Sequence, residues 1–168
     1  NALISLSQVS ETLCILLIPF FLKKFGIKKV MLLAMLAWVL RFGLFAVGNP
    51  GTGVWMFVVS MIVYGIAFDF FNVSGSLFVD KETDKKLRSS AQGVFMMMTN
   101  GFGATIGMIA AQYVVNHYVY SHTDVVQQLE GWRTSWFIFA GYALVVTILF
   151  AILFKYKHNP KDVENISH

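Results

Sequence analysis

Three ionisable side chains, Glu11, Arg41 and Asp69, each lie in the middle of a long apolar run of the sequence. Each is twelve residues from a lysine that flanks its run, and these lysines are Lys23, Lys29 and Lys81. Twelve helical residues span roughly 18 Å, a little over half of a bilayer hydrocarbon core about 30 Å thick. We therefore expect the three charges to share one layer near the middle of a membrane, where charge is costly and marks a candidate functional site.

The composition predicts a membrane protein. Of the 168 residues, 57% are hydrophobic and only 13% are charged, whereas a soluble domain carries about 25% charged residues. The apolar residues form long blocks between short polar clusters, so the predicted fold class is all-α, a polytopic membrane helix bundle. No metal or other cofactor is predicted, because Cys14 is the single cysteine and no cluster of metal ligands occurs.

Five apolar blocks predict five transmembrane helices. Their approximate limits are residues 2–22, 30–47, 54–79, 91–115 and 132–154, with a tail at 156–168. Eleven of the thirteen Lys and Arg residues lie in the segments 23–29, 80–90 and 155–168. The positive-inside rule then puts the C-terminus in the cytoplasm, and it makes these basic residues topology markers rather than a nucleic-acid surface. The first apolar block begins directly after Asn1, and it lacks the pattern of a signal peptide. We therefore expect a fragment of a longer protein.

Polar side chains share one face on two of these helices. Gln8 and Glu11 are three residues apart, which places them on the same side of the first helix. One side of the third helix carries Tyr64, Phe68, Asp69, Asn72 and Ser76. Unsatisfied polar groups in hydrocarbon cost several kcal/mol, so both faces should point into the bundle or a wet cavity. With Asn100 on the fourth helix, we expect the first, third and fourth helices to line a polar interior.

Purely structural roles, as an ion pair or in packing, remain open for the same residues. Glu11 and Arg41 are equally deep on consecutive antiparallel helices, so Arg41 is interpreted as one half of a structural ion pair with Glu11. Asp69 has no equally deep cation except Arg41. Tyr64 and Phe68 are also compatible with plain packing inside the bundle.

Enzyme chemistry finds little support in the apolar blocks. An aspartyl intramembrane protease needs two facing aspartates, and only Asp69 lies in a predicted span; no histidine lies in one. Proton-coupled transport does need a carboxylate in a water-poor setting, amides that bind a polar solute, and aromatic rings that stack on a flat one. A non-transporting membrane scaffold is the alternative from another class.

Several stretches resemble the bacterial nucleoside:proton symporters of the major facilitator superfamily. They are residues 8–11, 17–31, 37–43, 64–75 and 90–96, and the most specific is the run Tyr64-Gly65-Ile66-Ala67-Phe68-Asp69-Phe70-Phe71-Asn72. The resemblance implies that residues 1–155 correspond to helices eight to twelve of a twelve-helix fold in the bacterial inner membrane. The N-terminal half would then be a missing partner, and this fragment alone should not transport.

The resemblance also implies roles for the polar faces. Gln8 and Glu11 would contact ribose or couple protons, and Tyr64 and Phe68 would lie against the nucleobase. Asp69 would bind substrate or couple protons beside them, and Asn72 shares its substrate-binding face. A major facilitator for another polar solute, such as a sugar, is the nearest alternative.

Overall fold

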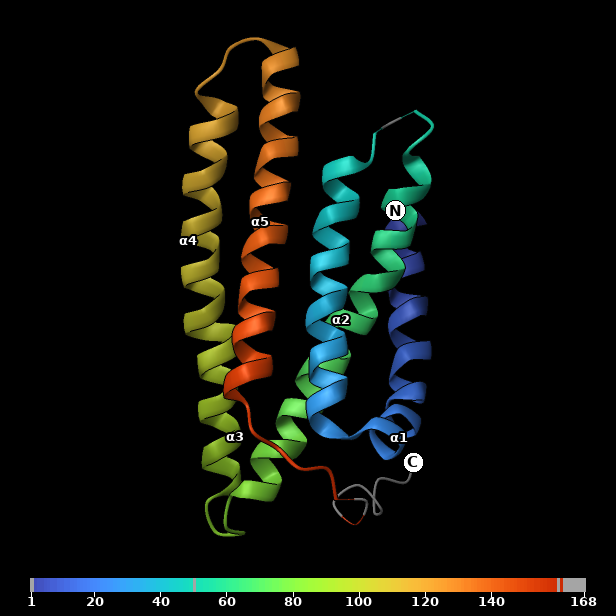
Figure 1. Ribbon diagram of the computed structural model, residues 1–168, viewed down its shortest axis with the longest axis vertical. Coiled ribbons are helices and arrows are strands. Elements are labelled where there is room, and N and C mark those ends of the chain that lie inside the picture. Colours follow the sequence, from blue (N-terminus) through green and yellow to red (C-terminus); the bar gives the residue numbers. More distant parts are fainter. Residues whose placement is uncertain (1, 50, 160, 162–168) are drawn as a thin grey trace.

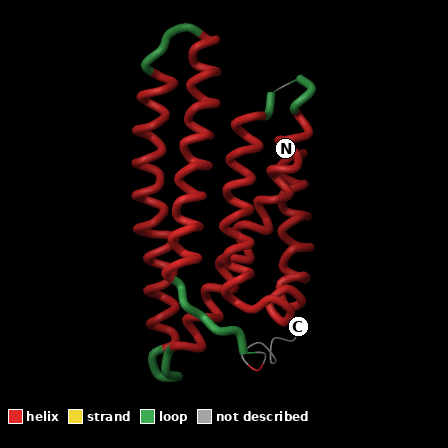
Figure 2. Tube along the Cα trace, in the orientation of Figure 1, coloured by secondary structure: helices red, strands yellow, loops and turns green. Residues whose placement is uncertain are grey.

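The chain is mostly helical in the part that the computed structural model describes, residues 2–49, 51–159 and 161 (Figure 2). Short turns join the helices, and these described residues contain no β-strand. In chain order the elements are α1 (Ala2–Val47), α2 (Val54–Glu82), α3 (Arg88–Met96), the π-helical η1 (Met97–Gly103), α4 (Ala104–Val115), the π-helical η2 (Asn116–Tyr120) and α5 (Val125–Leu153). A helix satisfies its own backbone hydrogen bonds, which is what an apolar chain in lipid requires.

Four helical stretches among the described residues are long and apolar enough to cross a membrane. They are Gln8–Val47, Val54–Glu82, Arg88–Tyr120 and Val125–Leu153. The predicted count of five is therefore not matched. The difference lies in α1, where the predicted spans 2–22 and 30–47 run into one another without a loop, and only Gly26 leaves helical geometry.

Gly26 divides α1 into a first arm, residues 2–25, and a second arm, residues 27–47. Its φ of 79° and ψ of 166° lie in a region that is open to glycine and strained for other residues. Figure 1 shows the chain reversing there, so that the two arms run antiparallel beside each other. A single residue thus makes the reversal that the sequence assigns to a basic loop at 23–29.

Helical structure also extends further between α4 and α5 than the sequence predicts. The polar connection expected at 116–131 shrinks to four residues, 121–124, because η2 continues to Tyr120 and α5 begins at Val125. Packing explains the added turns. Val119 is buried, and the backbone of Gly131 lies directly against the carbonyl group of Tyr118.

The buried core lies where the two arms of α1 meet α2. Its fully or nearly buried members are Cys14, Ile18, Leu22, Ile27, Val30, Met31, Ala34 and Phe70. The second arm also packs on α5 through stacked rings, with Trp136 centred 4.9 Å from Phe45 and 6.0 Å from Phe42. On the other side of α5, α4 runs antiparallel to it (Figure 1).

The segment after α5 crosses the end of the bundle that contains Gly26. Lys28 Nζ donates a hydrogen bond to the carbonyl of Ala151 at 3.0 Å, and the Lys81 ammonium lies 4.7 Å from the centre of the Tyr156 ring. The His158 ring lies beside Gly26. Residues 160 and 162–168 of the predicted tail lie outside the described part of the chain.

The first arm and α2 approach each other most closely at Gly65. A Cβ atom built on Gly65 would lie 3.0 Å from the backbone nitrogen and 3.1 Å from the Cα of Glu11. One residue earlier, Ser10 Oγ donates a hydrogen bond of 2.9 Å to the carbonyl of Ile62. Small residues allow such backbone contact between membrane helices, and interhelical hydrogen bonds add to it.

We expect Gly26→Ala to lower the free energy of unfolding by about 1–3 kcal/mol, since alanine must adopt a positive φ there. Its Cβ would also meet His158 Nδ1 at 2.5 Å. Thermal unfolding in detergent measures the effect. Gly43→Ala is the matched control on the same element, because no atom lies within 4 Å of its added Cβ. Equal stability of the two variants would contradict this account of the break in α1.

We expect Gly65→Ala to destabilise the protein by about 1–3 kcal/mol, because the added methyl group overpacks a contact made by backbone atoms that cannot rotate away. The same unfolding measurement applies. Gly141→Ala on α5 is the control, since its Cβ meets nothing within 4 Å. A Gly65→Ala protein as stable as this control would contradict the close backbone contact between the first arm and α2 at Gly65.

Candidate functional site

The predicted polar faces of the first arm and α2 meet at the close contact between Glu11 and Gly65. Tyr64, Phe68 and Asp69 lie on α2 within about one turn of Gly65, and Gln8 lies one turn before Glu11 on the first arm. Gln8 is exposed and Glu11 is partly buried. The structure therefore brings together two groups of residues that are more than fifty positions apart in the sequence.

The carboxylates of Glu11 and Asp69 are close enough to interact electrostatically. Asp69 is partly buried, and its Oδ2 atom is enclosed without a hydrogen-bond partner among the described residues. Neither carboxylate forms an ion pair within that part of the chain. Two neighbouring acids without a cation repel each other, and a proton on either one removes the repulsion.

Two aromatic rings continue this face along α2. Tyr64 and Phe68 are stacked, with ring centres 5.9 Å apart and an interplanar angle of 24°. Trp38 of the second arm meets Tyr64 edge-on at 5.9 Å. Phe68 keeps 40% of its surface exposed, so part of this residue is accessible to a ligand.

Asn72 lies one turn beyond Phe68 and is partly buried. Its Nδ2 donates a hydrogen bond of 2.9 Å to the carbonyl of Phe68 on the same helix. This bond fixes the amide next to the two rings. The amide oxygen is then the group available to accept a hydrogen bond from a ligand.

Arg41 does not pair with Glu11, contrary to the interpretation drawn from their equal depth. No carboxylate of the described residues lies within 4.0 Å of its guanidinium group. The guanidinium carbon lies instead 4.3 Å from the centre of the Tyr64 ring. Depth along a helix does not fix the direction in which a side chain points, and Arg41 points to the aromatic side of α2.

Asn100 is not brought to this site. It lies on η1, where it is exposed. The helix that carries it meets α2 at the far end, through a polar cluster that sequence reasoning missed. Gln92 Nε2 donates to the Ser76 carbonyl at 2.7 Å and to Asp80 Oδ1 at 3.1 Å. The signal for this cluster is the spacing of Ser76 and Asp80, four residues apart before the loop, with Gln92 soon after it.

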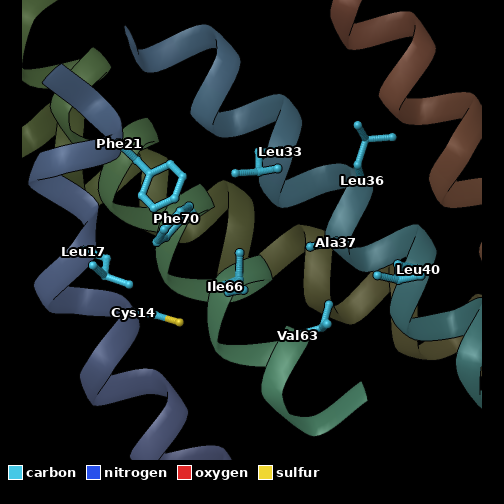
Figure 3. Close-up of a pocket in the computed structure, with 10 residues that line it drawn as sticks. All are labelled: Cys14, Leu17, Phe21, Leu33, Leu36, Ala37, Leu40, Val63, Ile66 and Phe70. Atoms are coloured by element: carbon cyan, nitrogen blue, oxygen red, sulfur yellow. The ribbon is translucent and has the colours of Figure 1, made fainter. Parts of the chain in front are cut away.

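A cavity of about 330 Å³ lies near the site but is chemically distinct from it. Figure 3 shows its lining side chains, which come from both arms of α1 and from α2 and are apolar except for the thiol of Cys14. Glu11 and Asp69 are not among them. Such walls offer almost no hydrogen bonds to a polar solute. Among the residues described, no three His, Cys, Asp or Glu side chains gather as metal ligands would.

Known proteins with this sequence pattern are membrane transporters. The nucleoside permease NupG of Escherichia coli (strain K12) is 51% identical over 171 residues, which cover 100% of this chain and 40% of that protein. The xanthosine permease of the same organism is 51% identical over 166 residues, which cover 98% of this chain and 38% of that protein. The chain thus spans about 40% of the length of these curated relatives.

The fold is also that of a solved transporter. A crystal structure of nucleoside transporter NupG matches 93% of this chain and 37% of its own with a TM-score of 0.81 and 53% identity. The family model described as "Nucleoside H+ symporter" matches residues 1–159. A match over nearly the whole chain shows that this protein belongs to the nucleoside H+ symporter family.

Proposed function

We propose that this chain is the C-terminal part of a bacterial inner-membrane transporter that couples nucleoside uptake to proton movement. The observation that carries the proposal is the contact between the first arm and α2, where Glu11 interacts with Asp69 on the same stretch of α2 that carries the stacked rings of Tyr64 and Phe68. Acids that exchange a proton and rings that bind a flat base are the two groups that such a transporter needs. Membership of the nucleoside H+ symporter family supports the same function.

A nucleoside has a flat base and a sugar rich in hydroxyl groups. The exposed part of Phe68, backed by Tyr64, suits the base, because aromatic rings prefer offset stacking. Gln8, Glu11 and Asn72 supply amide and carboxylate groups on the two facing helices, and these suit the ribose hydroxyls. Position and chemistry at the α1–α2 contact support each of these assignments.

Proton coupling is assigned to Glu11 and Asp69. Their negative charges repel each other, and Asp69 Oδ2 has no hydrogen-bond partner among the described residues. A proton that enters with the substrate would relieve this repulsion, and its departure would restore it. Proton and nucleoside binding would then favour each other, which is the reciprocal coupling that symport requires.

The two arms of α1 are proposed to cross the membrane separately, giving five crossings that correspond to helices eight to twelve of a major facilitator fold. A straight helix of 46 residues would be roughly 69 Å long, more than twice the hydrocarbon core of a bilayer. The reversal at Gly26 resolves this mismatch. With the basic segments inside, the reversal and the C-terminus lie on the cytoplasmic side.

The remaining part of the transporter is proposed as the partner of the exposed site face. The relatives are about two and a half times as long as this chain, which covers 40% of NupG. Transporters of this kind bind substrate between two halves and alternate access by rocking one half against the other. Gln8 and Phe68 are exposed here, as groups that face a second half would be.

We expect cells that express the full-length protein to accumulate labelled uridine and to lose that accumulation when an ionophore collapses the proton gradient. Glu11→Gln and Asp69→Asn should each reduce uptake about tenfold or more, since each removes a charged partner from the site. Glu82→Gln and Asp84→Asn are the matched controls, because both carboxylates lie outside the site. Glu82 is the last residue of α2, and Asp84 lies in the loop that follows. Uridine uptake that is unchanged when the proton gradient is collapsed would contradict the proposal of symport.

We expect Phe68→Leu to weaken nucleoside binding by about fivefold to a hundredfold, because base–aromatic stacking contributes about 1–3 kcal/mol. Isothermal titration of the purified full-length protein with uridine measures this change. Phe102→Leu is the control, since Phe102 is exposed on η1 away from α2. Equal affinities of the two variants would remove Phe68 from the binding site.

A further inference from the structure

The guanidinium group of Arg41 lies near three aromatic rings. Its guanidinium carbon lies 4.3 Å from the ring centre of Tyr64, 5.1 Å from that of Trp38 and 5.8 Å from that of Phe45. Trp38 and Phe45 lie three residues before and four residues after Arg41, so all three share one face of the second arm. The contact with Tyr64 is the shortest and is made across to another helix.

These rings, rather than an acid, hold the guanidinium group. Arg41 is partly buried, and its Nε is enclosed without a hydrogen-bond partner in the described part of the chain. No carboxylate from that part lies within 4.0 Å. A cation in such a place is stabilised by the negative faces of aromatic rings, an attraction that grows as water is removed.

Tyr64 connects this cation to the proposed nucleobase site. The Tyr64 ring stacks on Phe68, with ring centres 5.9 Å apart. Two residues of the second arm also contact the Tyr64 ring, Trp38 edge-on and Arg41 through its guanidinium group. A tyrosine ring turns about two side-chain bonds. Contacts with Arg41 and Trp38 oppose such rotation, and the planes of the Tyr64 and Phe68 rings lie 24° apart.

We propose that Arg41 is a positioning residue for nucleoside binding, acting through the ring of Tyr64 rather than through an ion pair. This inference depends on the proposed function, because it assumes that Tyr64 and Phe68 receive the base. Holding Tyr64 in place before the substrate arrives saves the ordering cost that binding would otherwise carry. Arg41 then sets affinity without touching the substrate.

A double-mutant cycle on the full-length protein tests this role, with uridine affinity measured by isothermal titration. Arg41→Met keeps the length of the side chain and removes the cation. We expect it to weaken binding by roughly threefold to thirtyfold in the wild-type background. In a Tyr64→Leu background the same change should have almost no effect, because residues that act through one contact are not additive. Arg41→Lys should fall between wild type and Arg41→Met.

The control is Arg133→Met, which removes an exposed guanidinium group of α5 that lies 5.8 Å from the Phe137 ring. It should leave uridine affinity unchanged. Thermal unfolding of every variant separates a loss of folding from a loss of positioning, and the Arg41→Lys variant keeps the test usable if Arg41→Met is unstable.

Two results would overturn the inference. One is an unchanged uridine affinity in Arg41→Met. The other is an equal loss from Arg41→Met in the wild-type and Tyr64→Leu backgrounds, which marks a role independent of Tyr64. A wild-type protein that binds no nucleoside is a different outcome, because it rejects the proposed function itself.

Discussion

The site depends on one close contact, that of the first arm with α2 at Gly65. Helices in lipid gain little from hiding apolar surface against each other, so they associate where their backbones fit closely and where a hydrogen bond crosses the interface. Gly65 provides the fit against Glu11, and Ser10 provides the bond to Ile62. Because of this contact, the acid of one helix lies near the acid of the other.

The separation of Arg41 from Glu11 matters for the proton exchange that is proposed at this contact. An ion pair between them would compete with the exchange of a proton that is proposed for Glu11. The rings of Tyr64, Trp38 and Phe45 take up the cation instead. The charge of Arg41 is thus stabilised without neutralising the carboxylates, and the same contact fixes Tyr64.

Sequence patterns predict the helices and their polar faces, because helical periodicity tells which residues share a side. They identify the family and place Tyr64, Phe68, Asp69 and Asn72 on one face, while the roles of these residues stay predictions. They fail at Arg41, because the rise of a helix gives depth but not the rotation of the helix about its axis. They fail also at Gly26, where a single glycine replaces a loop, and at residues 116–131, which become helical by packing on one another.

The helix that runs from α3 to η2 is packed only near its ends. Gly75 lies against the Phe95 ring at one end, and Gly131 lies against Tyr118 at the other. Between them, none of the residues of η1 or α4 is buried, and Asn100 exposes its amide. An amide facing hydrocarbon is costly, so this middle section needs protein or water beside it. In the proposed transporter the other half supplies the protein surface that covers this section.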